Sequence, residues 1–134
     1  MSDRRKAKLN ELEAAGFEIV LLNGLFDVEL YKHLLKIDVL LNIHYEIPAN
    51  AEVLRIVEGL FNGCIVLTEN NDTTSWLGYE DLKSMVLESA YEQIADQLFA
   101  IKQDVRGIRQ QLQMSCLPKF REWFCLTDGV TGVK

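Results

Sequence analysis

The chain is poor in the residues that fibrous, disulfide-linked and disordered proteins require. Its 134 residues contain only 3 cysteines, 2 prolines and 8 glycines, against 49% hydrophobic residues. These counts exclude a collagen-like repeat, a disulfide scaffold and a disordered chain. A domain of this length buries roughly two thirds of its unfolded surface. We therefore expect a single domain over residues 1–126 and a loose tail over residues 127–134.

Positive charge and long apolar runs are also scarce. The 14 Lys+Arg are outnumbered by 20 Asp+Glu, which gives a net charge of -6. This balance argues against long nucleic acid as a partner, because phosphate-backbone binding needs cations that displace counterions. No apolar run reaches the roughly 18 residues of a membrane span. The basic start of the chain is not followed by the apolar stretch of a signal peptide.

The cysteines Cys64, Cys116 and Cys125 show neither metal-hook nor disulfide spacing. We therefore expect reduced thiols, no metal site and a cytoplasmic protein. Cys64 lies in the apolar run CIVL, and we expect it to be a small buried hydrophobe.

The apolar pattern alternates between helical and strand-like periods. Helices are predicted over residues 5–15, 27–36, 51–62 and 91–113, and short strands over residues 17–22, 39–44 and 64–67. Residues 84–87 predict either a fourth strand or part of one long helix over residues 79–113. This alternation favours a single Rossmann-like α/β domain, with a mostly parallel sheet of about four strands and helices on both faces.

Three helical segments carry more specific expectations. The stripe of helix 27–36 is expected to face the core through Val28, Leu30, Tyr31, Leu34 and Leu35. In helix 51–62, Ile56 is expected at the edge of the buried stripe. A break at Pro118 is expected to precede a short aromatic helix that contains Phe120, Trp123 and Phe124.

Polar residues cluster where the predicted strands end. Ligands of open α/β sheets bind beyond the carboxyl ends of the strands, and these ends carry Asn23-Gly24, His44-Tyr45-Glu46, Thr68-Glu69-Asn70 and Glu88-Ser89. The helix predicted to begin near Asn50 directs free N–H groups into the same region, which suits phosphate or carboxylate. We expect a ligand site at this edge of the sheet.

Two groups there admit both a structural and a functional interpretation. His44 is either a hydrogen-bonded residue that holds the strand end or a polar contact to a ligand. Glu52, Arg55 and Glu58 lie three residues apart on one predicted helix. They form either an ion-paired exposed face or part of the site.

The motifs of several large classes are absent. The chain has no GxGxxG after its first predicted strand, no GxxxxGK[ST] and no GxSxG. Dinucleotide oxidoreductases, P-loop NTPases and α/β-hydrolases are therefore disfavoured. A receiver-type domain needs an acidic pair for Mg²⁺ after the first strand, where Asn23-Gly24 supplies no carboxylate.

Three blocks, in their order and spacing, resemble a known family. They are LLNIHY over residues 40–45, AEVLRIVEGL over residues 51–60 and GCIVLTE over residues 63–69. They look like the carboxyl-terminal, donor-binding half of glycosyltransferases with two Rossmann-like domains (GT-B type). The similarity extends over residues 4–113, because AYEQI over residues 90–94 also resembles the family.

The resemblance implies that the chain binds a nucleotide-sugar. Glu58 matches a glutamate that hydrogen-bonds the nucleotide ribose, and a carboxylate accepts well from two hydroxyls. Glu52 and Arg55 match the "lE..R" of a narrower group, which places Arg55 to meet a phosphate. Asn50 stands where retaining enzymes carry an earlier glutamate, and this departure leaves the catalytic residues unassigned.

The resemblance and the strand ends together give one predicted ligand-binding set, in which His44, Tyr45 and Glu69 line the sugar end. The set is Asn42, His44, Tyr45, Glu52, Arg55, Glu58, Thr68 and Glu69. No further cofactor is expected.

A GT-B enzyme reacts across a cleft between two domains, so sugar transfer is expected to need a second domain or a partner. The alternative is a non-catalytic protein-interaction or inhibitor module that retains the Rossmann-like fold and acts through a protein partner or as a homo-oligomer. Trp76, Trp123 and Phe124 are then either interface anchors or ordinary core residues.

Overall fold

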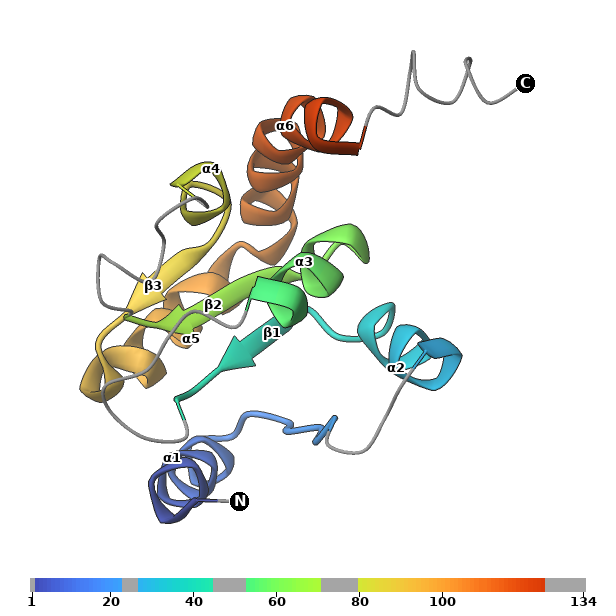
Figure 1. Cartoon of the computed structure of the whole chain (residues 1–134). Coiled ribbons are helices and arrows are strands. Elements are labelled where there is room, and N and C mark those ends of the chain that lie inside the picture. The colour runs from blue at the N-terminus through green and yellow to red at the C-terminus, as the bar shows by residue number, and fades with distance from the viewer. Residues whose placement is uncertain (1, 23–26, 45–52, 71–79, 125–134) are drawn as a thin grey trace.

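A small parallel sheet organises residues 2–22, 27–44, 53–70 and 80–124, which the computed structural model describes. Its strand order is β1-β2-β3 (Figure 1). β1 spans Val39–Asn42, β2 spans Ile65–Glu69 and β3 spans Leu87–Ser89. Helices lie on both faces of this sheet, so the α/β fold class is confirmed.

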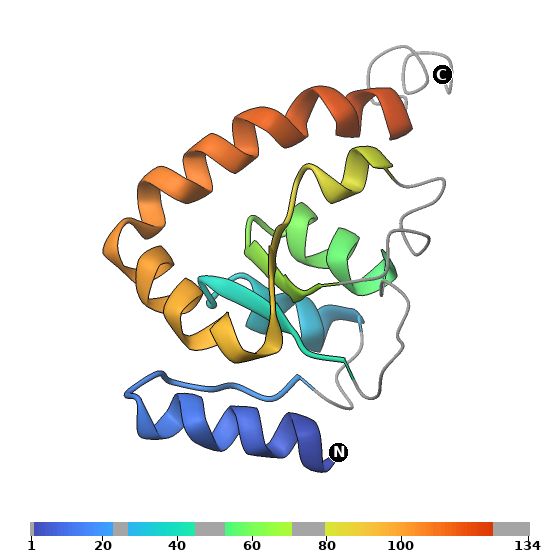
Figure 2. The ribbon, with the colours of Figure 1, turned by 90° about the vertical axis from the view of Figure 1, so that its left-hand side faces the viewer.

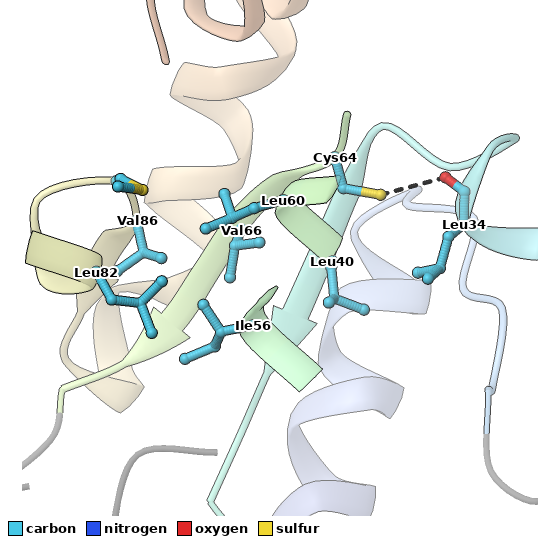
Figure 3. Close-up of a cluster of buried hydrophobic side chains, with 9 residues drawn as sticks. Leu34, Leu40, Ile56, Leu60, Cys64, Val66, Leu82 and Val86 are labelled. Carbon is cyan, nitrogen blue, oxygen red and sulfur yellow. Dashed lines mark hydrogen bonds between the residues drawn. The ribbon is translucent and has the colours of Figure 1, made fainter. Parts of the chain in front are cut away.

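One face of the sheet is covered by α3 (Val53–Phe61) and α4 (Glu80–Lys83), and α2 (Asp27–Leu34) packs against the same cluster from beside β1. The thiol of Cys64 lies in the cluster on this face and donates to the carbonyl oxygen of Leu34 at 3.2 Å (Figure 3). Cys64 is 5% exposed, so the expectation of a small buried residue is confirmed, and this burial raises the pKa of the thiol to about 11. The cluster consists of Leu34, Leu40, Ile56, Leu60, Cys64, Val66, Leu82, Met85 and Val86.

The other face is covered by α1 (Asp3–Ala14), α5 (Ile94–Gln103) and the start of α6 (Val105–Phe124). The 3-10 turn η2 (Tyr91–Gln93) leads into α5. In Figure 2, α1 lies at the bottom of the view and α6 runs as a long diagonal along its upper left. The buried cluster on this face consists of Leu12, Ile43, Ile65, Leu67, Ile94, Leu98 and Ile101.

α1 begins at Asp3, two residues before the predicted start at residue 5, and ends at Ala14, one residue before the predicted end. The Ser2 hydroxyl accepts from the backbone N–H of Arg5 at 3.3 Å, as an N-cap does. The chain leaves the helix at Gly16, whose φ of 98° lies in the left-handed region that favours glycine.

Residues 17–22 do not form the predicted strand. They run as an extended segment back over α1 without joining the sheet (Figure 2). Phe17 and Ile19 pack toward the α1/α5 cluster, and Leu22 packs toward the α2/α3 cluster. The segment thus passes the edge of the sheet and touches both clusters, whereas its residues Val20 and Leu21 are 44% and 56% exposed.

The C-terminal half also differs from the prediction. The long-helix alternative for residues 79–113 is wrong, because β3 pairs with β2 from Leu87 to Ser89, and the strand begins later than the predicted residues 84–87. α5 and α6 are separated at Asp104. The expected break at Pro118 is wrong, since α6 continues to Phe124 with the proline inside it. The side chains of Phe120, Trp123 and Phe124 lie outside the described residues, as does Trp76.

The apolar stripe of α2 is only partly buried. Leu34 is 2% exposed and Leu30 packs against the core, but Val28, Tyr31 and Leu35 are 62%, 42% and 71% exposed. The expectation that all five face the core is therefore wrong, because α2 sits beside the edge strand and touches the core along one side. Ile56 of α3, expected at the edge of its stripe, is completely buried. Within the described residues, no helix combines the length and apolar character needed to cross a membrane.

We predict that Gly59→Ala destabilises the fold. A Cβ at this position of α3 would lie 2.6 Å from Leu40 Cδ2 and 3.1 Å from Val66 Cγ2. Overpacking costs about 1–3 kcal/mol, which outweighs the gain of about 1 kcal/mol in helix propensity. Urea unfolding should show a loss of about 1 kcal/mol, partly restored when Leu40→Val removes Cδ2. Stabilisation by Gly59→Ala would contradict the close packing of α3 on β1.

Candidate functional site

Five polar side chains are buried at the carboxyl ends of the three strands. They are at most 4% exposed: Asn42, His44, Thr68, Glu69 and Ser89. Four of them belong to the predicted ligand-binding set. Tyr45 and Glu52, the two members of that set on residues 45–52, lie outside the described residues, as does Asn23-Gly24.

The alternation of side chains divides this polar edge into two halves. Leu40 and Val66 pack in the α2/α3 cluster, so Asn42 and Thr68, two residues further along each strand, lie on the same face. Ile65 and Leu67 pack in the α1/α5 cluster, which places Glu69 on the opposite face.

The half that faces α1 is closed by an ion pair. The guanidinium of Arg4 binds both oxygens of the Glu69 carboxylate. This hydrogen bonding to Glu69 raises the pKa of Arg4, against the lowering effect of burial. One Glu69 oxygen also accepts from the backbone N–H of His44 at 3.2 Å.

Further contacts hold α1 over the same half. Arg4 Nη1 donates to the carbonyl oxygen of His44 at 3.3 Å, and Arg5 Nε donates to that of Ile43 at 2.7 Å. The Arg4 guanidinium carbon lies 4.1 Å from the centroid of the Tyr91 ring, and the Tyr91 hydroxyl donates to the Arg4 carbonyl oxygen at 2.8 Å. Arg4 and Arg5 therefore satisfy the backbone carbonyl groups of Ile43 and His44, the two residues that follow β1.

The half that faces α3 is polar but incompletely bonded. The amide nitrogen of Asn42 donates to Thr68 Oγ1 at 3.1 Å, and His44 Nε2 lies 2.9 Å from the carbonyl oxygen of Asn70. Among the described residues, none provides a hydrogen-bond partner for Asn42 Oδ1 or His44 Nδ1. His44 therefore makes the hydrogen bond expected of a residue that holds the strand end, and its second ring nitrogen, Nδ1, has no partner among the described residues.

A groove with a volume of about 920 Å³ follows the outer edge of β1. It is lined by residues 16–22, by β1 and by residues of the helices on both faces of the sheet: α2 and α3 on one face, and α1, α5 and the start of α6 on the other. Asn42, Arg55 and Glu58 line it together. Arg55 is exposed and Glu58 is half-buried.

The structure therefore places the described members of the set in two adjoining groups. Asn42, Arg55 and Glu58 share the groove, whereas His44, Thr68 and Glu69 lie at the buried strand ends. Glu52 lies outside the described residues. It is one of the three residues of the alternative ion-paired exposed face, together with Arg55 and Glu58. The described residues contain no group of three or more His, Cys, Asp or Glu side chains arranged to hold a metal ion.

The sequence pattern did not predict the role of Arg4 and Arg5, which close the half of the polar edge that faces α1. Arg4 and Glu69 are 65 positions apart, and no local pattern links residues at that separation. The only signal was the basic start Arg4-Arg5-Lys6, which is equally typical of an exposed helix terminus.

Comparisons with known proteins identify no relative of this chain: no family model, no curated protein and no solved structure matches it.

We predict that Arg4→Ala destabilises the fold much more than Lys6→Ala on the same helix. Glu69 would keep a buried carboxylate without its cation, and removing one partner of a buried pair costs about 3–5 kcal/mol. Arg4 is partly exposed, so we expect about 2–3 kcal/mol in urea unfolding, against less than about 0.5 kcal/mol for the exposed Lys6. Adding Glu69→Gln should recover part of the loss. Equal effects of the two single substitutions would show that the ion pair is dispensable.

Proposed function

We propose that the chain binds a nucleotide-sugar in the groove beside β1, as a donor-binding domain similar to that of GT-B glycosyltransferases. The observation that carries the proposal is the shared position of Asn42, Arg55 and Glu58 along one groove. The volume of about 920 Å³ falls within the roughly 300–1,000 Å³ of small-molecule sites.

Each of the three side chains supplies a different part of the recognition. Glu58 accepts hydrogen bonds from the ribose hydroxyls, for which a carboxylate has two oxygens. Arg55 lies one turn closer to the start of α3, where its guanidinium and the helix dipole both favour a diphosphate. Asn42 lies at the carboxyl end of β1, and the sugar extends from the phosphates toward it.

Glu69 takes a different role in this proposal from the one that the sequence predicts. Both of its oxygens are engaged by Arg4, so it positions the ends of β1 and β2. Sugar transfer requires an acceptor on the opposite side of the ligand. We propose that a second domain or a partner supplies that side.

Nucleotide-sugar binding should raise the melting temperature of the chain, and Glu58→Gln should reduce the rise. A ligand at about 100 times its Kd stabilises the native state by roughly 2.7 kcal/mol, which a thermal-shift screen of UDP-, GDP-, ADP- and CMP-sugars detects. Glu13→Gln, on the exposed side of α1, is the matched control. Absence of a shift with every nucleotide class would contradict the proposal, and an unchanged shift in a folded Glu58→Gln variant would remove Glu58 from the site.

A second candidate function, a self-associating interaction module, is favoured by the outer face of α2. Val28, Tyr31 and Leu35 lie at i, i+3 and i+7 and are exposed, so they form one apolar stripe. The helical hydrogen bonding continues through the turn, since the Leu35 N–H donates to the Tyr31 carbonyl oxygen at 3.0 Å. We propose a second copy of the chain as the occupant of this stripe.

Charge order along the stripe suits an antiparallel, two-fold arrangement of two α2 helices. Each residue of the stripe is followed directly by a charged residue. These charged residues are Glu29, Lys32 and Lys36, and they form a row beside the stripe that is negative at its start and positive at its end. A two-fold axis reverses one helix against the other, which brings Glu29 of each copy beside Lys32 and Lys36 of the second copy. α2 is only about 12 Å long, so the dimer is expected to be weak.

Sedimentation velocity over a wide range of protein concentration tests this second candidate. Leu35→Glu should abolish concentration-dependent dimerisation, whereas Met114→Glu on α6 should not, although both residues are 71% exposed. Glu29→Lys should weaken the dimer, and adding both Lys32→Glu and Lys36→Glu should restore it. A wild-type chain that stays monomeric at every concentration would rule out a second copy as the occupant.

A further inference from the structure

The outer edge of β1 carries backbone groups that no neighbouring strand pairs. β1 lies at one end of the strand order β1-β2-β3. The Ile65 N–H donates to the Asp38 carbonyl oxygen at 3.0 Å, so the backbone groups of Asp38 and of every second residue after it point toward β2. The N–H and C=O groups of Val39 and Leu41 therefore point away from β2. Within the described part of the chain, no residue forms a hydrogen bond with these outward groups.

Arg5 marks where this open edge ends. The next outward carbonyl group along the chain is that of Ile43, and it accepts from Arg5 Nε at 2.7 Å. This contact agrees with the alternation, because Ile43 lies two residues beyond Leu41. Both Arg5 and Ile43 line the groove beside β1. The unpaired stretch thus runs from Val39 to Leu41 along the floor of that groove.

Apolar side chains line the groove from both faces of the sheet. Leu30 and Leu34 belong to the packing of the α2/α3 cluster, and Leu98 and Ile101 belong to the α1/α5 cluster. A strand placed in the groove would direct its successive side chains toward these two clusters in turn. Such a strand is buried on both faces, and its sequence is therefore expected to be a continuous apolar run.

These features decide which kind of occupant the groove fits. A second copy of the sheet cannot reach β1, because α2 and residues 17–22 flank this edge in each copy and would collide (Figure 1). A hydrocarbon chain would leave the outward groups of Val39 and Leu41 buried without partners, which is unfavourable. An extended peptide supplies N–H and C=O groups at the spacing of a strand, about 7 Å for every two residues.

The charge of the groove narrows the choice further. Asp38, one of the acidic residues of the lining, is paired with Arg109 at 2.9 Å. The other acidic residues of the described lining are Glu18 and Glu58, against the basic Arg5, Lys36, Arg55 and Lys102. The groove is therefore more positive than the chain as a whole, whose net charge is -6. This contrast favours an occupant with acidic residues beside its apolar run.

We propose that the outer edge of β1 binds an extended segment of a protein partner, with β-branched apolar residues between acidic ones, as an added strand. The backbone of the segment pairs with Val39 and Leu41, and its side chains fill the space between the two clusters. The inference does not rest on the proposed function, because it uses the backbone of β1 and would hold if no nucleotide-sugar binds. Where both hold, the segment and the nucleotide-sugar compete for the groove.

Hydrogen exchange of the wild-type chain tests the pairing directly. The probe is a synthetic peptide with a run of valine and isoleucine residues between pairs of glutamates. The amides of Val39 and Leu41 should become protected when the probe binds, whereas those of Leu40 and Asn42, which point toward β2, should change little. Unchanged exchange at Val39 and Leu41 under saturating probe, or a Kd weaker than about 1 mM, would overturn the proposal.

Two alternately N-methylated versions of the probe test whether its backbone carries the binding. One version has its methyl groups on the amides that face β1, and the other has them on the amides that face away. The first should bind roughly 3- to 10-fold more weakly for each hydrogen bond lost, and the second should bind like the unmodified probe. Equal affinities of all three peptides would contradict an added strand.

Substitutions in the chain give an independent readout. Leu41→Pro removes an outward N–H and leaves the groups that point toward β2, so it should weaken probe binding. Lys36→Glu should weaken it through charge, whereas Lys32→Glu, at a position outside the described lining, is the matched control and should not. If Leu41→Pro does not fold, Lys36→Glu and the exchange measurement still decide. Unchanged affinity in a folded Leu41→Pro variant and in Lys36→Glu would refute the inference.

Discussion

The buried carboxylate of Glu69 constrains how this small sheet can be closed. β2 is the central strand and is buried along its whole length, including Thr68 and Glu69 at its carboxyl end. A charge in that position requires a cation and further hydrogen bonds, and α1 brings both through Arg4. The same helix satisfies the carbonyl groups of Ile43 and His44. The ion pair therefore fixes where α1 lies and which half of the polar edge α1 closes.

The opposite half of the edge has the complementary property. Asn42 donates to Thr68 and the His44 ring contacts the backbone carbonyl oxygen of Asn70, but Asn42 Oδ1 and His44 Nδ1 have no partner among the described residues. The strand alternation that places Glu69 toward α1 also places Asn42 and His44 toward α3. One half of the edge is thus stabilised by the protein's own charges, and the other half has hydrogen-bonding capacity for an added group.

Much of the fold could be predicted from local patterns. The apolar runs at residues 39–44 and 64–67 and the helix between them predicted β1, α3 and β2. Residues 17–22 misled the prediction, because an extended segment that touches two cores has the same composition as a buried strand. The apolar stripe of α2 misled it for a related reason, since periodicity does not reveal whether a helix lies over a sheet or beside its edge.

The convergence of polar residues at the strand ends was also predictable, because parallel strands present their carboxyl ends at one edge. What the sequence could not reveal was the division of that edge. It depends on the contact between Arg4 and Glu69, 65 positions apart, and on the groove left between β1 and residues 17–22. Both arise from tertiary packing rather than from any local pattern of residues.

The most direct test of a divided edge is a nuclear magnetic resonance titration of the labelled chain that follows side-chain signals during addition of a nucleotide-sugar. The account predicts that the signals of the Asn42 amide, the His44 ring and the Arg55 guanidinium shift with a common affinity. The signals of Arg4 and Tyr91 should stay in place. Shifts confined to Arg4 and Tyr91, with none at Asn42 and His44, would contradict the account.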